Sequence, residues 1–134
     1  MEMPNINLLS ITPIYIALLG ILFVPFTMRV GLYRVKNEII IGDGKDEELI
    51  RRIRGQGNFV ETVPLALVLV LLMEILGAGD AWLHALCALL VGGRFLHYLG
   101  ITELAPSICR PVGMFATLSI YFVAPIWILM DGLA

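Results

Sequence analysis

Residues 51–76 have the sequence RRIRGQGNFVETVPLALVLVLLMEIL, in which charged and amide side chains lead directly into an apolar run. Four polar side chains share one face of a helix at about 100° per residue: Arg51, Arg54, Asn58 and Glu61. A charged group at membrane depth costs about 2.5–3.5 kcal/mol, so such groups usually face a bundle interior, a cavity or a ligand. This face is therefore the first candidate for a functional site.

The composition is that of an integral membrane protein. Of the 134 residues, 59% are hydrophobic and 15% are charged, with a mean hydropathy of +0.91, which excludes an ordinary soluble domain. A spanning helix needs about 20 mostly apolar residues. Four segments qualify and fill residues 1–134 as a single domain: Leu8–Arg34, Glu47–Leu76, Ala81–Ile101 and Arg110–Met130. The predicted fold class is all-α, an integral membrane four-helix bundle.

The basic residues predict how this bundle lies in the membrane. All nine Lys and Arg residues lie around the connections between the first and second and between the third and fourth segments. The opposite side carries only acidic groups: Glu2, Glu74, Asp80 and Asp131. By the positive-inside rule, the basic connections face the cytoplasm and both termini face outward. The first segment lacks a basic n-region and is uncharged from Asn5 to Met28, so we expect a retained anchor.

Three other segments bring polar groups to the same boundary. Arg29 lies at the end of the first segment, Arg94, His97 and Tyr98 share a face of the third, and Arg110 begins the fourth. Glu61 alone cannot balance these guanidinium groups. An anionic ligand with more than one carboxylate fits, because Arg binds carboxylates in a bidentate manner. The structural alternative is an Arg54–Glu61 ion pair that, with Asn58, holds helices together.

The cysteines and histidines predict neither a disulfide nor a metal site. Cys87 and Cys109 fall at different depths of the membrane, and two cysteines make no framework. His97 has no second histidine or cysteine at ligand spacing, so we expect no metal.

Several motifs, taken in chain order, resemble those of the MAPEG family, the membrane-associated proteins in eicosanoid and glutathione metabolism. Within this family the chain resembles a bacterial member similar to the microsomal glutathione transferases. The first is Arg54-Gly-Gln-Gly-Asn58-Phe-Val-Glu61 followed by Pro64, with Gly42-Asp-Gly upstream. The others are Gly93-Arg94-Phe-Leu-His97 and Arg110-Pro-Val-Gly-Met. The resemblance covers nearly the whole chain.

This resemblance implies a homotrimer in the bacterial inner membrane, with glutathione as cosubstrate held between subunits near the cytoplasmic side. It assigns the following residues to glutathione binding: Arg29, Arg54, Gln56, Asn58, Glu61, Arg94, His97 and Tyr98. Arg34 competes with Arg29 for the role on the first helix. A second tyrosine often found further along the third helix is Ile101 in this chain, which departs from the family pattern.

The resemblance also implies a mechanism in which Arg110 lies beside the sulfur and favours the thiolate, the actual nucleophile. The thiolate would attack a lipophilic electrophile or hydroperoxide, as in a transferase with peroxidase activity, while Cys109 is a rival nucleophile. Two other functions stay open: a non-catalytic scaffold or lipid-binding protein, and a proton-coupled transporter built on Glu61. Neighbouring arginines would hold such a carboxylate ionised, which weighs against the transporter. Membrane lipids are expected partners, and nucleic acid is not.

Overall fold

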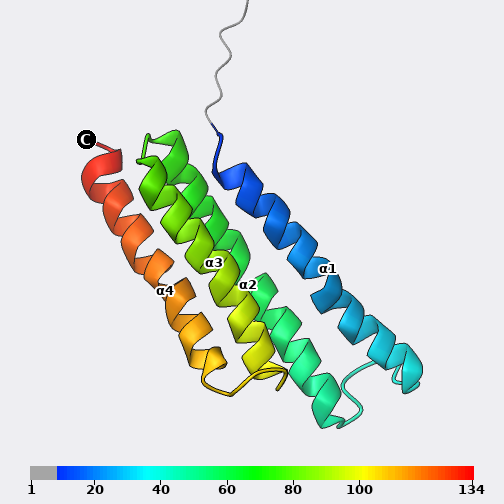
Figure 1. The fold of residues 1–134 in the computed structure, drawn as a ribbon. Coiled ribbons are helices and arrows are strands. Elements are labelled where there is room, and N and C mark those ends of the chain that lie inside the picture. The colour runs from blue at the N-terminus through cyan, green and yellow to red at the C-terminus, as the bar shows by residue number, and fades with distance from the viewer. Residues whose placement is uncertain (1–8) are drawn as a thin grey trace, which may run out of the picture.

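The computed structural model describes residues 9–134, which form four long helices running up and down as a bundle (Figure 1). They are α1 (Thr12–Lys36), α2 (Glu47–Ile75), α3 (Asp80–Ile101) and α4 (Cys109–Trp127), and a π-helical turn, η1 (Ile128–Gly132), prolongs α4. No strand occurs in this described part, and all four helices are long and apolar enough to cross a membrane. The predicted all-α membrane bundle is therefore confirmed. The predicted start at Leu8 lies outside the described residues.

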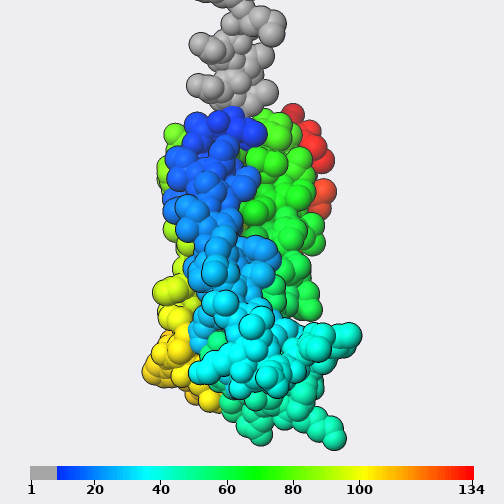
Figure 2. All heavy atoms as spheres, turned by 90° about the vertical axis from the view of Figure 1, so that its right-hand side faces the viewer, coloured from blue at the N-terminus to red at the C-terminus, as the bar shows by residue number. Residues whose placement is uncertain are grey.

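The two basic connections lie at one end of the bundle. In Figure 1 the α1–α2 and α3–α4 connections are at the lower end, while the start of α1 and the C-terminus are at the upper end. The 29 residues of α2 correspond to about 44 Å of helix, which exceeds a hydrocarbon core of about 30 Å. Figure 2 shows α1 lying against α2, with the connection between them protruding at the basic end.

The start of α2 is fixed by its own cap. Asp46 accepts a hydrogen bond from the Leu49 N–H at 2.8 Å, and Glu47 and Glu48 follow in the first turn. A carboxylate at this position satisfies an N–H that has no helical partner, and acidic groups interact favourably with the positive end of the helix dipole. The polar face of α2 therefore begins at a defined residue.

The start of α1, in contrast, is capped by another helix. Its N-cap residue, Ile11, has no side chain that can accept a hydrogen bond. Instead, the Glu74 carboxylate of α2 accepts hydrogen bonds from the backbone N–H groups of Ser10, Ile11 and Thr12 at 2.6, 2.7 and 2.8 Å. These are among the N–H groups that a helix start leaves without partners. The sequence shows Glu74 only as an acidic group at the outer end of its helix.

The outer surface of the bundle is apolar and its interior is packed between helices. Leu19, Val70, Leu90 and Ile120 are fully buried. On the outside, Ile21 and Phe115 expose 70% and 72% of their surface. Exposed apolar side chains over the length of every helix fit a lipid environment rather than water.

Close approach of α3 and α4 depends on glycines. A Cβ added at Gly93 would lie 2.9 Å from the Ala116 Cβ and 3.0 Å from the Gly113 carbonyl oxygen. A Cβ at Gly100 would lie 2.5 Å from the backbone nitrogen of Arg110. Small residues let helix backbones approach within a membrane. The last turn of α3 and the first turn of α4 therefore meet directly at Arg110.

Candidate functional site

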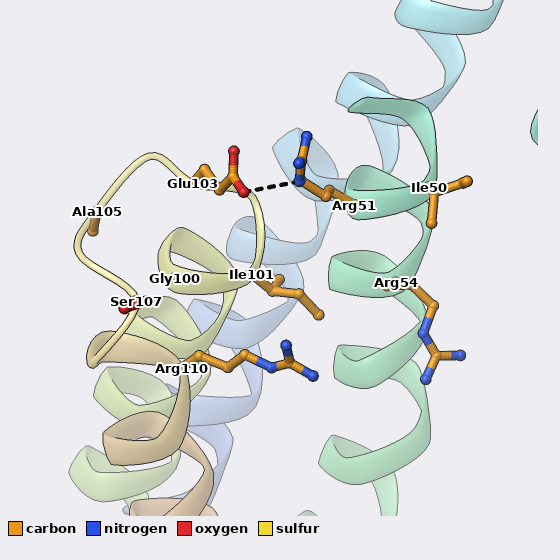
Figure 3. A pocket seen from close by; sticks show the side chains of 9 residues that line it. All are labelled: Ile50, Arg51, Arg54, Gly100, Ile101, Glu103, Ala105, Ser107 and Arg110. Atoms are coloured by element: carbon orange, nitrogen blue, oxygen red, sulfur yellow. Dashed lines mark ion pairs between the residues drawn. The ribbon is translucent and has the colours of Figure 1, made fainter. Parts of the chain in front are cut away.

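A cavity of about 330 Å³ opens at the basic end, between the first turns of α2 and the α3–α4 connection (Figure 3). The residues that line it are Ile50, Arg51, Arg54, Gly100, Ile101, Glu103, Ala105, Ser107 and Arg110. Three of them are arginines, from two helices that are far apart in the sequence. In Figure 3 the Arg110 side chain extends from α4 toward α2, whereas Arg54 stands at the rim, on the outer side of α2.

The charges in this cavity are unevenly balanced. Arg51 forms ion pairs with Glu103 at 3.0 Å and with Glu47 at 3.3 Å. Within residues 9–134, neither Arg54 nor Arg110 has a carboxylate within 4.0 Å. The guanidinium groups of Arg54 and Arg110 are thus not neutralised by an ion pair within the described residues. No group of three or more His, Cys, Asp or Glu side chains that could hold a metal ion is found in the described range.

His97 lies behind Arg110 rather than in the cavity. It is 3% exposed, and its Nδ1 is 2.9 Å from the carbonyl oxygen of Arg110. Because a carbonyl oxygen can only accept, Nδ1 carries the hydrogen and donates it. Together with the close contact at Gly100, this bond fixes the first turn of α4 against α3. His97 therefore positions Arg110 through its backbone, and in this protomer it does not face the space where a ligand could enter.

Arg94 links three helices through hydrogen bonds. It is 1% exposed, and its guanidinium donates to the Thr62 Oγ1 of α2 and to the Gly113 carbonyl of α4, both at 3.0 Å. Buried polar groups at membrane depth are expected to face the bundle interior and to be hydrogen-bonded. The structure thus places Arg94 in the interior and away from the cavity lining, although the sequence pattern grouped it with the ligand-binding residues.

Three more predicted residues meet at the junction of α1, α2 and α3. Tyr98 is 2% exposed and stacks on Phe26, with ring centroids 3.5 Å apart and an angle of 5°. The guanidinium of Arg29 lies 5.7 Å from the centre of the Tyr98 ring. Gln56 turns toward α1 and donates to the Thr27 Oγ1 at 3.1 Å. This group is separate from the cavity that Arg54 and Arg110 line.

Asn58 and Glu61 continue the outer face of α2. Glu61 is exposed, like Arg54, and Asn58 is half-buried between them. The predicted structural alternative, an Arg54–Glu61 ion pair, does not form among the described residues. Further along the same face, Leu65 and Val68 expose 57% and 49% of their surface. This face therefore presents polar groups at one end, with no ion pair to the rest of residues 9–134, and apolar side chains at the other.

Two features of the cavity are absent from the sequence prediction. The sequence pattern places Arg51 on the polar face but predicts no binding role for it, and no pattern points to Glu103 or Ser107 of the α3–α4 connection, which also line the cavity. Helical periodicity indicates which residues share a face, but it carries no information on the path of a connection. The two cysteines are free thiols, Cys87 buried and Cys109 half-buried.

Comparison with known proteins agrees with this architecture. The MAPEG family model matches residues 12–130, which include all four helices. The inner membrane protein YecN from two strains of Escherichia coli is 37% identical to this chain over 91 residues, covering 67% of this chain and 69% of YecN. The family match confirms the family predicted from the sequence. The relative is named as an inner membrane protein. The chain belongs to the MAPEG family.

Proposed function

We propose that this MAPEG protein is a glutathione-dependent membrane transferase whose site lies at the basic end of the bundle. The observation that carries the proposal is that Arg54 and Arg110 line one cavity, Arg110 from inside and Arg54 from the rim, and that neither pairs with a carboxylate of residues 9–134. Glutathione has two carboxylates and a thiol. A cavity of about 330 Å³ lies at the lower end of the usual range of small-molecule sites, about 300–1,000 Å³.

The two arginines have different tasks in this proposal. Arg54, at the rim, binds a glutathione carboxylate, because a guanidinium can donate two parallel hydrogen bonds to it. Arg110, inside the cavity, lies beside the sulfur. A free thiol has a pKa near about 8.5, and an adjacent cation lowers it, which increases the thiolate fraction at neutral pH. Glu61 meets the γ-glutamyl ammonium group.

The thiolate then reacts with a lipophilic substrate that arrives through the bilayer. In the transferase reaction the sulfur donates an electron pair to an electrophilic carbon, the carbon–sulfur bond forms, and the leaving group departs with its bonding pair. With a hydroperoxide the thiolate attacks the terminal oxygen, the oxygen–oxygen bond breaks, and the sulfur becomes a sulfenic acid, while the alkoxide takes a proton from water and leaves as an alcohol. The thiol of a second glutathione then attacks the sulfenic acid, which forms the disulfide and releases water. Arg110 stabilises the sulfur anion before either attack.

A second copy of the chain completes this site in the proposed homotrimer. Arg29 and Gln56 lie on the α1 side of α2, whereas Arg54 and Glu61 lie on its outer face. One protomer therefore cannot direct all four residues at one ligand. Polar groups left open to lipid are costly, so a neighbouring subunit against the outer face would cover them. The basic end faces the cytoplasm in this arrangement, in accord with the positive-inside rule.

Calorimetry with the purified, detergent-solubilised protein tests the proposal. We expect glutathione to bind the wild type. Arg54→Ala should weaken binding by about 1.5–3 kcal/mol, the range for a hydrogen bond to a charged group, which is about 10- to 150-fold in Kd. Lys36→Ala is the matched control, because it removes an exposed cation at the same end without touching the cavity. No binding at millimolar glutathione contradicts the proposal, and binding without turnover of chlorodinitrobenzene would indicate a non-catalytic member.

A further inference from the structure

The third arginine of the cavity already holds a carboxylate from the protein itself. Arg51 lines the same cavity as Arg54 and Arg110, and its Nε lies 3.0 Å from Glu103 Oε1. Figure 3 shows this ion pair spanning the gap between α2 and the α3–α4 connection. Glu103 is the acidic residue among those that line the cavity. One of three cations at this site is thus neutralised from within.

The turn that ends α3 brings Glu103 to this place. The Leu104 N–H donates to the Leu99 carbonyl at 2.9 Å, and Glu103 adopts a left-handed conformation with φ of 57°. This is the geometry of a helix C-terminal cap. It turns the chain back toward α2, so that a carboxylate from the connection meets a guanidinium of the helix. The Glu103 side chain remains 66% exposed and can return to water.

We propose that Glu103 occupies the place of a ligand carboxylate on Arg51, and that a ligand with two carboxylates displaces it. Arg51 would then favour dicarboxylate ligands over monocarboxylates, and Glu103 would limit that preference, because it competes only with the second carboxylate of a ligand. A ligand with one carboxylate binds Arg54 and leaves the Arg51–Glu103 pair intact. A ligand with a second carboxylate exchanges it for Glu103, so that Arg51 keeps an anionic partner throughout. The identity of the ligand as glutathione rests on the function proposed above.

The exchange is easy because the pair is exposed. An ion pair between exposed side chains is so weak that breaking it changes a dissociation constant by only about 1.4- to 5-fold. Glu103 therefore lowers the affinity for a dicarboxylate by a small factor and does not block the site. Removing its charge without changing its shape should raise that affinity by a similar factor.

A double-mutant cycle read by calorimetry tests this inference. Glu103→Gln should tighten glutathione binding about two- to fivefold. The gain should vanish in an Arg51→Met background, where nothing is left to exchange, and with glutathione monoethyl ester, which has one free carboxylate. Glu47→Gln is the matched control, because Glu47 also pairs with Arg51, at 3.3 Å, but does not line the cavity; its effect should be smaller. An equal gain in affinity from Glu103→Gln in the Arg51→Met background, or with the ester, would mean a general charge effect and would overturn the inference. Weaker binding of glutathione to Glu103→Gln would also overturn it.

A third ligand, glutarate, separates this inference from the proposed function, because it has two carboxylates and no thiol. If glutathione fails to bind but glutarate binds with the same dependence on Glu103 and Arg51, the proposed function is wrong and the inference holds. If glutathione binds and turns over while neither ligand responds to Glu103, the inference is wrong and the function holds. If neither ligand binds any variant, both are wrong.

Discussion

Replacement of Gly100 by alanine should displace Arg110 directly. A Cβ at Gly100 would lie 2.5 Å from the Arg110 nitrogen, 3.0 Å from its Cα and 3.0 Å from the Cys109 carbonyl carbon. All three atoms belong to the backbone, which cannot rotate away as a side chain can. Carbon contacts are comfortable at about 3.5–4.0 Å, so the first turn of α4 would have to move by about 1 Å.

The expected magnitude has two parts. Overpacking of this kind costs about 1–3 kcal/mol of stability. The same movement lengthens the 2.9 Å hydrogen bond from His97 to the Arg110 carbonyl and shifts the Arg110 guanidinium, which the proposed function assigns to the sulfur. A displacement of about 1 Å in a reacting group can lower the rate about 100-fold. We therefore expect a moderate loss of stability and a much larger loss of turnover.

Gly92→Ala provides the control on the same helix. A Cβ there would have no atom within 4 Å, and alanine in place of glycine within a helix is favourable by about 0.5–1 kcal/mol. Thermal unfolding in detergent, followed by circular dichroism, and turnover of chlorodinitrobenzene should be measured for both variants. If Gly100→Ala unfolds and turns over like the wild type, α3 does not press on Arg110 and our account of how the site is positioned is refuted.

Two further experiments test the fold. Glu74→Gln should lower the unfolding temperature, since three N–H groups at the start of α1 lose a charged acceptor at a cost of about 1–3 kcal/mol; the exposed Glu38→Gln is its control, and equal unfolding temperatures would speak against the cap. Single cysteines at Lys45 and Ala134, introduced after replacement of Cys87 and Cys109, should be labelled from opposite sides of the membrane. Labelling of both from one side would exclude the topology.

The helices could be predicted because their signals are local. Each apolar run is long enough to span a membrane, and the turn residues between the runs are visible in the sequence. Antiparallel helices then bring Arg54 and Arg110 to the same end, although 56 positions of sequence numbering separate them. Proximity of this kind follows from element order alone.

The inward or outward direction of each polar face could not be read in the same way. Arg94, His97 and Tyr98 share a helical face, as the spacing predicts, but periodicity does not indicate whether that face meets a ligand or another helix. In the structure it is buried, with Arg94 bonded to Thr62 and Gly113. Glu74 and Glu103 act on partners in other elements, which no local pattern encodes.

The central claim is that Arg110 stabilises a glutathione thiolate, and a thiolate absorbance titration of bound glutathione tests it most directly. The thiol should ionise at lower pH when bound to the wild type than when free in solution, because a nearby cation favours the anion. In Arg110→Ala that pH should rise toward the value of the free thiol and turnover should fall, while glutathione still binds through Arg54. An Arg110→Ala protein with the wild-type titration curve and wild-type turnover would contradict the account.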